Sequence, residues 1–263
     1  MAARLVTIGP PPTGIYRLSH RPADPFAPPD WQYALEDGTF GNRFDDPRAE
    51  QGVPLAARFR TIYCATQRVG TFGETLARFR LSLPLVAQLE AVEDEEPIEE
   101  SLIGALDPDD HRRGLIAADW RHHRHVGHTY LDPSLRFVDI VAGASMQALR
   151  EPLAPVATDL GISEIDLSSV TSQQRRFTQF CAQYIHDEVD EAGQPALAGI
   201  RYLSRLNPEW ECWAIFDDRI RHEPGFPAPP ESIFPDDRDL ETVAHLFDLT
   251  IEIMPGHGQY SRP

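Results

Sequence analysis

The alternation of apolar and polar positions predicts several short strands along this chain. Segments rich in β-branched and aromatic residues occupy 15–19, 61–65, 137–141, 200–204, 212–216 and 249–254. A loop containing Asn207 and Pro208 separates two of them, 200–204 and 212–216. These two segments therefore predict neighbouring strands.

Apolar residues at helical spacing predict helices between the strands. A helix over 71–81 is expected to begin at an N-cap, Thr71, with Glu74 three residues later. Residues 145–160 predict one or two helices broken at Pro152 and Pro155. The longest helix is expected over 172–189, and its apolar face holds Phe177, Phe180, Cys181, Tyr184 and Ile185.

A last helix is expected over 240–246, and proline-rich loops over 20–30 and 223–235. Residues 39–46 read as a glycine-containing turn between aromatic residues. Strands and helices mix without strict alternation, which favours an α+β fold over a doubly wound sheet.

Composition excludes several classes of protein. The chain of 263 residues has 24 arginines and no lysine, which excludes a Walker A phosphate loop and Schiff-base chemistry. Any anionic ligand must therefore be held by arginine, backbone amides or helix ends. The net charge of −17 argues against nucleic acid as the main partner.

The charge is concentrated in an acidic stretch, 90–100, which predicts a solvated loop or helix edge. No apolar run approaches the roughly 20 residues of a membrane span, and no signal peptide is apparent. The expected location is the cytoplasm, where Cys64, Cys181 and Cys212 are expected to be buried free thiols.

A histidine cluster offers one candidate metal site: His122, His123, His125 and His128, with His111 nearby. Arg121 and Arg124 interrupt the cluster, and no cysteine or carboxylate pattern completes a zinc set. We therefore expect no metal, and interpret the segment as a solvated or anion-facing loop. A second interpretation is that Arg121 and Arg124 help to bind phosphate or an acidic partner.

Four other segments matter through their order and spacing. They are Tyr16-Arg17, Gly41-Asn42-Arg43-Phe44, Tyr63 followed by Glu74, and Tyr202-Leu203-Ser204 ahead of 213–216. Each alone is usually structural: a surface arginine, a core tyrosine, a capping glutamate or a filler serine. Together they resemble the RES domain, a family named for an arginine, a glutamate and a serine.

The resemblance implies one domain over 1–263, with its core at about 14–253 and an inserted acidic and histidine-rich region at about 84–135. It also implies a fold related to ADP-ribosyltransferases and the activity of an NAD⁺-degrading toxin. The implied partner is a cognate antitoxin protein, and a homodimer is a family expectation.

The family's roles carry over only to matching positions. Glu74, Arg43 and Ser204 match the residues that give the family its name, and so are the expected catalytic residues. The expected substrate-binding residues are Arg17, Tyr63, Tyr16 and Tyr202.

The chemistry of NAD⁺ cleavage requires the same residue types. Cleavage of the N-glycosidic bond of NAD⁺ generates an oxocarbenium-like ribose, which a carboxylate such as Glu74 can stabilise. Arginine forks suit the pyrophosphate, and Tyr63 offers a face for nicotinamide. Ser204 can bond a ribose or phosphate oxygen, or steady Glu74.

Three interpretations stay open at this point. The first is an NAD⁺ glycohydrolase or phosphorylase, with water or inorganic phosphate as acceptor and no further cofactor. The second is a protein-modifying ADP-ribosyltransferase. The third is a non-catalytic interaction module with the same fold.

Overall fold

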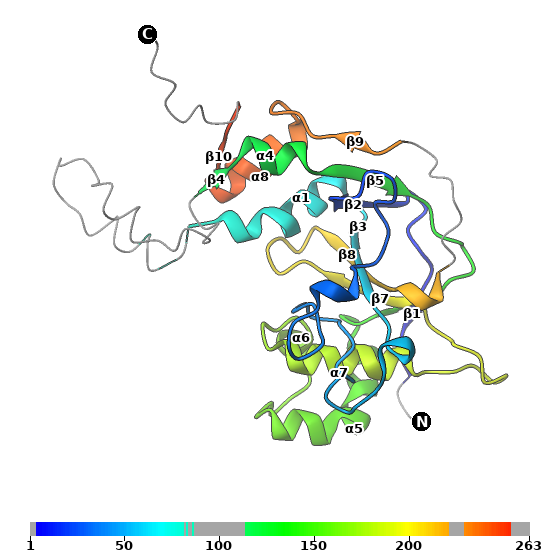
Figure 1. Cartoon of the computed structure of the whole chain (residues 1–263). Helices are drawn as coiled ribbons and strands as arrows, with labels where there is room; N and C mark the ends of the chain where they lie inside the picture. The colour runs from blue at the N-terminus through cyan, green and yellow to red at the C-terminus, as the bar shows by residue number, and fades with distance from the viewer. Residues whose placement is uncertain (1–3, 82, 84–85, 87–113, 221–228, 254–263) are drawn as a thin grey trace, which may run out of the picture.

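An eight-stranded sheet forms the centre of the molecule (Figure 1). A computed structural model describes residues 4–81, 83, 86, 114–220 and 229–253. The strand order is β1-β6-β7-β8-β3-β2-β5-β9. The strands are β1 (Thr7–Ile8), β2 (Ile15–Ser19), β3 (Thr61–Ala65), β5 (His125–Thr129), β6 (Phe137–Asp139), β7 (Gly199–Leu203), β8 (Glu211–Phe216) and β9 (Glu231–Ser232).

Most of these strands were predicted. The pair 200–204 and 212–216 is confirmed as β7 and β8, which run antiparallel with Tyr202 opposite Cys212. Only β6 and β7 are parallel within this sheet, and a long crossover with three helices joins them. With six α-helices among the described residues, the predicted α+β class is confirmed. The relation to ADP-ribosyltransferases stays a prediction.

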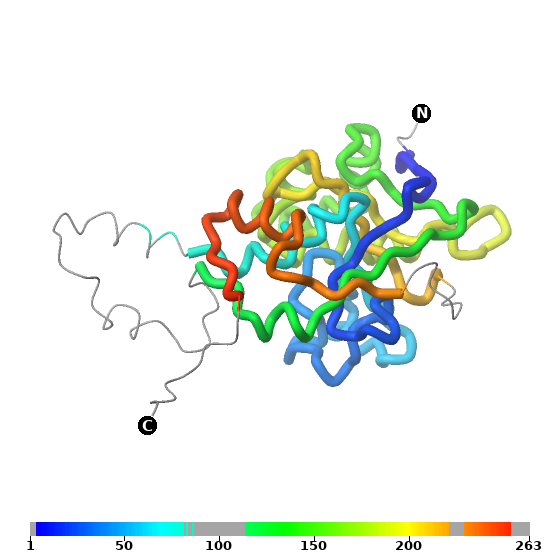
Figure 2. Tube along the Cα trace, turned by 90° about the horizontal axis from the view of Figure 1, so that it is seen from above, coloured from blue at the N-terminus to red at the C-terminus, as the bar shows by residue number. Residues whose placement is uncertain are grey.

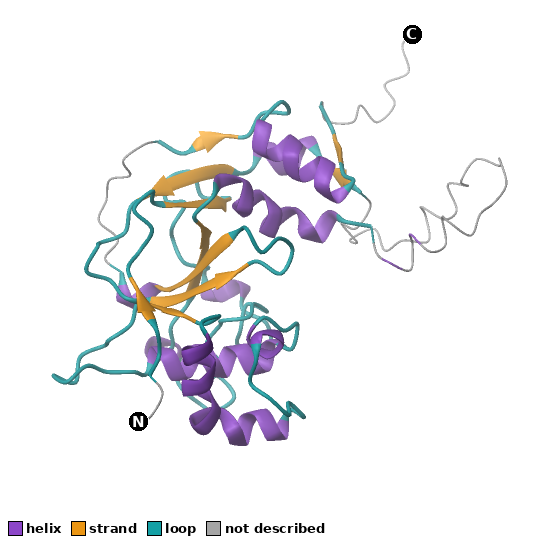
Figure 3. Cartoon of the chain, turned by 180° about the vertical axis from the view of Figure 1, so that it is seen from behind, coloured by secondary structure: helices purple, strands orange, loops and turns teal. Residues whose placement is uncertain are grey.

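The helices form two groups, one at each end of the sheet (Figure 3). One group holds α5 (Gly143–Asp159), α6 (Leu167–Val170) and α7 (Arg175–His186). The other holds α1 (Arg68–Leu76), α4 (Ala118–His122) and α8 (Arg238–Phe247). The 3₁₀ turns are η1 (Trp31–Tyr33), η2 (Leu55–Ala57), η3 (Ala77–Phe79) and η4 (Asp217–Arg219).

Two predicted helices differ from those observed. The expected break at the prolines is wrong, because α5 runs through Pro152 and Pro155 as one helix. Its Leu149, Leu153 and Ala157, four residues apart, are buried on one face, and this packing outweighs the lost backbone hydrogen bonds. The helix α7 is confirmed with its apolar face, but it is shorter than α5.

The helix that carries Glu74 begins three residues earlier than predicted. Its N-cap is Gln67, and Thr71 lies inside α1. The Thr71 hydroxyl accepts a hydrogen bond from the Leu18 amide of β2 at 3.2 Å. Thr71 therefore joins helix to sheet instead of capping the helix.

Three apolar clusters hold the layers together. One lies between strands β6–β8 and helices α5 and α7, and another between β2, β5 and helices α1 and α8. The third covers the opposite face of the sheet, where Phe26 of the predicted 20–30 loop packs on Ile62 and Trp213. Figure 2 shows β2 (blue), β5 (green) and β9 (orange) side by side.

The predicted insertion at 84–135 has two parts. Its second part includes β5, which pairs with both β2 and β9, so this part belongs to the central sheet. The acidic stretch 90–100 and His111 lie outside the described residues. The expected final strand is only β10 (Thr250–Ile251), which pairs with β4 (Leu115–Ile116) in a separate small sheet.

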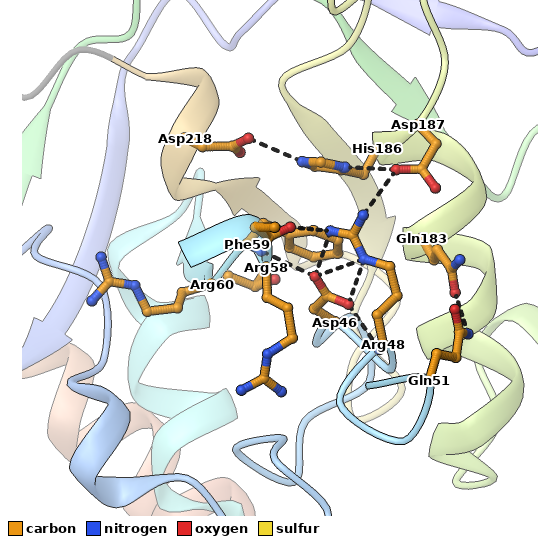
Figure 4. A network of polar contacts seen from close by, with 12 residues as sticks. Asp46, Arg48, Gln51, Arg58, Phe59, Arg60, Gln183, His186, Asp187 and Asp218 are labelled. Atoms are coloured by element: carbon orange, nitrogen blue, oxygen red, sulfur yellow. Dashed lines mark hydrogen bonds and ion pairs between the residues drawn. The ribbon is translucent and has the colours of Figure 1, made fainter. Parts of the chain in front are cut away.

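A polar network fixes the loop after residue 45 to α7 (Figure 4). Asp46, 4% exposed, accepts hydrogen bonds from the Arg48 guanidinium at 2.6–3.0 Å and from the Phe59 amide at 3.0 Å. His186 lies between Asp187 and Asp218, with both distances 3.0 Å, and its ring stacks on Phe59. The Arg48 cation is thus paired with the carboxylates of Asp46 and Asp187.

Candidate active site

A large cleft lies where β2 and β3 meet the helix α1. The two strands pair at a single position, Tyr16 opposite Ala65, so the sheet is open on this side. The resulting pocket has a volume of about 1050 Å³. Five of the seven expected site residues line it: Arg17, Arg43, Tyr63, Glu74 and Tyr202.

Close packing of the β7–β8 hairpin on α1 brings Ser204 to Glu74. A Cβ atom at Gly73 would lie 1.9 Å from the Trp210 ring, so only glycine allows this approach. Trp210 in turn accepts a hydrogen bond from the Ser204 amide at 2.9 Å. The Ser204 hydroxyl donates to Glu74 Oε1 and accepts from the Leu206 amide. Ser204, 4% exposed, therefore holds the Glu74 carboxylate in place from behind the pocket wall.

Arg43 is presented by a tight turn. Gly41 has a φ of +72°, a conformation that favours glycine. The Asp45 carboxylate accepts hydrogen bonds from the Phe40 and Asn42 amides, and burial raises the pKa of Asp45. The Tyr63 hydroxyl accepts a bond from the Phe44 amide at 2.9 Å. The turn is thus fixed on both sides of Arg43.

The Arg43 guanidinium lies over the Tyr202 ring, 4.6 Å from its centroid. Its Nη1 atom is buried, and no described residue gives that atom a hydrogen-bond partner. A buried donor without a partner is costly, and because Arg43 also lines the pocket, an anionic ligand bound there would supply the missing partner. Tyr202 supports Arg43 with its ring, while Tyr63 also lines the pocket and holds the turn through its hydroxyl.

Three further arginines line the pocket, and the sequence reasoning did not single them out: Arg78, Arg175 and Arg205. With Arg17 and Arg43 they make five arginines against one carboxylate, Glu74, in a protein of net charge −17. Burial, and then the positive charge of Arg43, lowers the pKa of Arg205. The pocket therefore has the charge expected of an anion-binding site.

The sequence contained a signal for two of these arginines, but not for the third. Arg205 directly follows Ser204, and Arg78 follows Glu74 by four residues, one helical turn along the chain. Arg175 begins α7, and its Nη1 lies close to Gly41 of the Arg43 turn. Only the tertiary fold places it in the pocket.

The Tyr16-Arg17 pair has a different setting. Arg17 lines the pocket, but its Nη1 donates to the carbonyls of Pro25 and Ala27 at 3.0 and 2.7 Å. Burial lowers the pKa of Arg17. Tyr16 lies outside the pocket lining and stacks on His128, with centroids 4.3 Å apart.

The expectation that the histidine-rich segment is a loop is wrong, because it forms the end of α4 and the strand β5 of the central sheet. Arg121 is 2% exposed and donates to the backbone oxygens of Glu252 and Ile253, so its position is structural. Across the described ranges, no three His, Cys, Asp or Glu side chains gather in a way that could hold a metal ion. The three cysteines are buried and free, as predicted.

Comparison with known proteins identifies the family. A family model described as the RES domain matches residues 15–239, which include all the expected site residues. No curated protein and no solved structure matches the chain. Among the described residues, no helix combines the length and apolarity needed to cross a bilayer. The match covers most of the 263 residues, and the chain therefore belongs to the RES-domain family, which at family level has a toxin-like, NAD-related role.

Proposed function

We propose that this protein cleaves the bond between nicotinamide and ribose in NAD⁺, and that it acts as the toxin of a toxin–antitoxin pair. The observation that carries the proposal is the pairing, in one pocket, of a single positioned carboxylate with several arginines that have no carboxylate partner among the described residues. The dinucleotide needs both: a carboxylate beside the ribose and cations around the pyrophosphate.

Glu74 is the proposed catalytic carboxylate. As the bond from the ribose C1′ to nicotinamide breaks, its electron pair leaves with neutral nicotinamide, and positive charge develops on the ribose. The Glu74 carboxylate, held by Ser204, stabilises that charge. An oxygen of water or of inorganic phosphate then forms the new bond to C1′.

The arginines are the proposed binding groups. Arg43 offers a buried nitrogen without a partner, and its planar fork suits two oxygens of one phosphate. Arg205 and Arg175 lie near it and add positive charge. Tyr63 is the proposed face for the nicotinamide ring.

The test is NAD⁺ consumption by the purified protein, with and without phosphate, followed by the mass of the product. The Glu74→Gln variant should lose about 10²- to 10³-fold in rate, as expected for loss of one transition-state contact. Glu209→Gln removes the same charge from an exposed position between β7 and β8, outside the pocket lining, and should retain full activity. A folded wild-type protein that leaves NAD⁺ intact under both conditions would contradict the proposal.

The cellular role has its own test. Expression of the protein should deplete NAD⁺ and stop growth, since the proposed site acts on the cytoplasmic pool. Co-expression of a cognate antitoxin should restore both. Normal growth with normal NAD⁺ at high expression of folded protein would count against the toxin role.

A further inference from the structure

Two neighbouring arginines lie at one edge of the pocket on a pair of contacting aromatic rings. The Arg78 guanidinium, which lines the pocket, lies over Phe79 at 5.1 Å. The Arg124 guanidinium lies over Trp120 at 4.7 Å. Phe79 and Trp120 meet edge to face, with centroids 5.7 Å apart. The two rings therefore hold the two cations close to each other.

Two histidines join them. Ser19 of β2 pairs with His125 of β5, which brings the adjoining residues, His20 and Arg124, to the same end of the two strands. His123 precedes Arg124, and its ring bonds the Asp119 carbonyl at 2.8 Å. Burial, and then the charges of Arg124 and Arg78, lowers the pKa of His20. We name His20, Arg78, His123 and Arg124 the basic cluster.

The basic cluster lacks a counter-charge. In the part of the chain that the structure describes, neither Arg78 nor Arg124 forms an ion pair, and Arg124 donates only to the Trp120 carbonyl. Burial, and then the charge of Arg78, lowers the pKa of Arg124 to about 10. Like charges held together in a strongly acidic protein favour an anion as the missing partner.

We propose that the basic cluster binds a phosphate group at this edge of the pocket. Arg78 and Glu74 both line the pocket, so a phosphate bound by Arg78 would lie in the same cavity as the catalytic carboxylate. What the phosphate does there rests on the proposed function. It is either inorganic phosphate or the 2′-phosphate of a phosphorylated dinucleotide such as NADP⁺.

For inorganic phosphate the step balances without a further reactant. A phosphate oxygen forms the bond to C1′ while the bond to nicotinamide breaks and its electron pair leaves with nicotinamide. The phosphate proton stays on the new ester. The products are nicotinamide and a phosphorylated ADP-ribose.

Calorimetric titration of the full chain with inorganic phosphate tests the site without any turnover. Arg124→Gln should weaken phosphate binding about tenfold or more, and Arg78→Gln likewise. The matched control is Arg80→Gln, because Arg80 also lies on an aromatic ring, Phe247, but outside the pocket lining. The affinity of the Arg80→Gln variant for phosphate should stay within about twofold of wild type.

Kinetics separate the two sources of phosphate. If the ligand is inorganic phosphate, NAD⁺ consumption should saturate with phosphate, and Arg124→Gln should raise the KM for phosphate but not for NAD⁺. If the ligand is a 2′-phosphate, Arg124→Gln should lower kcat/KM for NADP⁺ alone, and inorganic phosphate should compete with NADP⁺.

Equal phosphate affinity in wild type, Arg124→Gln and Arg78→Gln, all folded by circular dichroism, would overturn the inference. This result is distinguishable from failure of the proposed function. A protein that consumes NAD⁺ but binds phosphate equally in all three forms contradicts only the phosphate site. A protein that binds phosphate through Arg124 but leaves dinucleotides intact contradicts only the proposed reaction.

Discussion

Arginines serve opposite purposes in two regions of this molecule. In the network of Figure 4, Arg48 bonds the buried Asp46 carboxylate, and that hydrogen bond raises the pKa of Arg48. In the pocket, Arg43 lies on an aromatic ring with a buried nitrogen that no described residue satisfies. In the first region the Arg48 cation has carboxylate partners, whereas in the second Arg43 has none among the described residues.

The comparison shows where this acidic chain uses its limited positive charge. Asp and Glu outnumber Arg 41 to 24, so carboxylates are plentiful in this chain. An arginine that has no carboxylate partner among the described residues therefore does not reflect a shortage of carboxylates. Keeping Arg43, Arg175 and Arg205 near each other costs stability through repulsion. Such a cost is typical of a site arranged for binding instead of folding.

Loss of Arg48 should have the largest effect on stability. Arg48→Ala leaves the Asp46 carboxylate buried without its cation and should lower the free energy of unfolding by about 3 kcal/mol. Urea unfolding measures this. The control is Arg176→Ala, because its partner Glu50 is half exposed, and its cost should stay below about 1 kcal/mol. Equal costs for the two variants would remove the distinction between the regions.

Loss of Arg43 should affect activity strongly and stability little. Arg43→Ala should lower kcat/KM for NAD⁺ about 100-fold, or about 2.7 kcal/mol, mainly by raising KM. Its free energy of unfolding should stay within about 1 kcal/mol of wild type, because lost ring contact and relieved repulsion offset each other. Arg43→Lys keeps the charge but loses the planar guanidinium fork, so its kcat/KM should lie between those of wild type and Arg43→Ala. A wild-type KM in Arg43→Ala would break the comparison.

Ser204 should affect catalysis more than binding. Without its hydroxyl the Glu74 carboxylate loses a hydrogen bond that fixes its position, so Ser204→Ala should lower kcat about tenfold at unchanged KM. Ser204→Thr keeps the hydroxyl and should restore most of the rate. If the alanine variant instead raises KM alone, Ser204 contributes to binding and not to the position of Glu74.

Five strands of the central sheet, β2, β3, β6, β7 and β8, were predicted from a local signal, whereas β5 lies in a segment that was expected to be a loop. The segments 61–65 and 212–216 are apolar enough on both faces to define a buried sheet without knowledge of its neighbours. The helix errors have a tertiary cause. Packing of Leu149, Leu153 and Ala157 carries α5 through two prolines, and the Leu18 amide takes the Thr71 oxygen that local rules assign to a cap.

The site residues that match the motifs of the family were predictable from the sequence, whereas those outside the motifs were not. Five of seven expected residues line the pocket, and Ser204 lies directly behind it. The position of Arg175 and Arg78 in the pocket depends on contacts between segments far apart in the chain, which no local pattern encodes. The same holds for Tyr16, which lies on a strand beside the pocket but faces His128.

The smallest effect should come from the helix α1, which has a paired arginine at its start and a different kind of arginine just beyond its end. At its start Arg68 makes two hydrogen bonds to Asp237, at 2.6 and 2.9 Å, whereas Arg78 beyond its end has no carboxylate partner in the described ranges. Burial acts to raise the pKa of Asp237, but the hydrogen bonds from Arg68 and the Leu240 amide outweigh it and hold that pKa below 3.8.

The sign of the pH effect follows from this lowered pKa. The folded protein keeps Asp237 ionised at a pH where the unfolded chain protonates it, so the pair stabilises the fold fully above the ordinary pKa near 3.8. This contribution is lost as the pH falls through the folded pKa. Asp237→Asn should therefore cost about 1 kcal/mol at neutral pH, and progressively less below pH 3.8. Chemical unfolding of both proteins across this range measures the difference, and a gap that stays constant with pH would mean that Asp237 acts as a helix cap and not as the partner of Arg68.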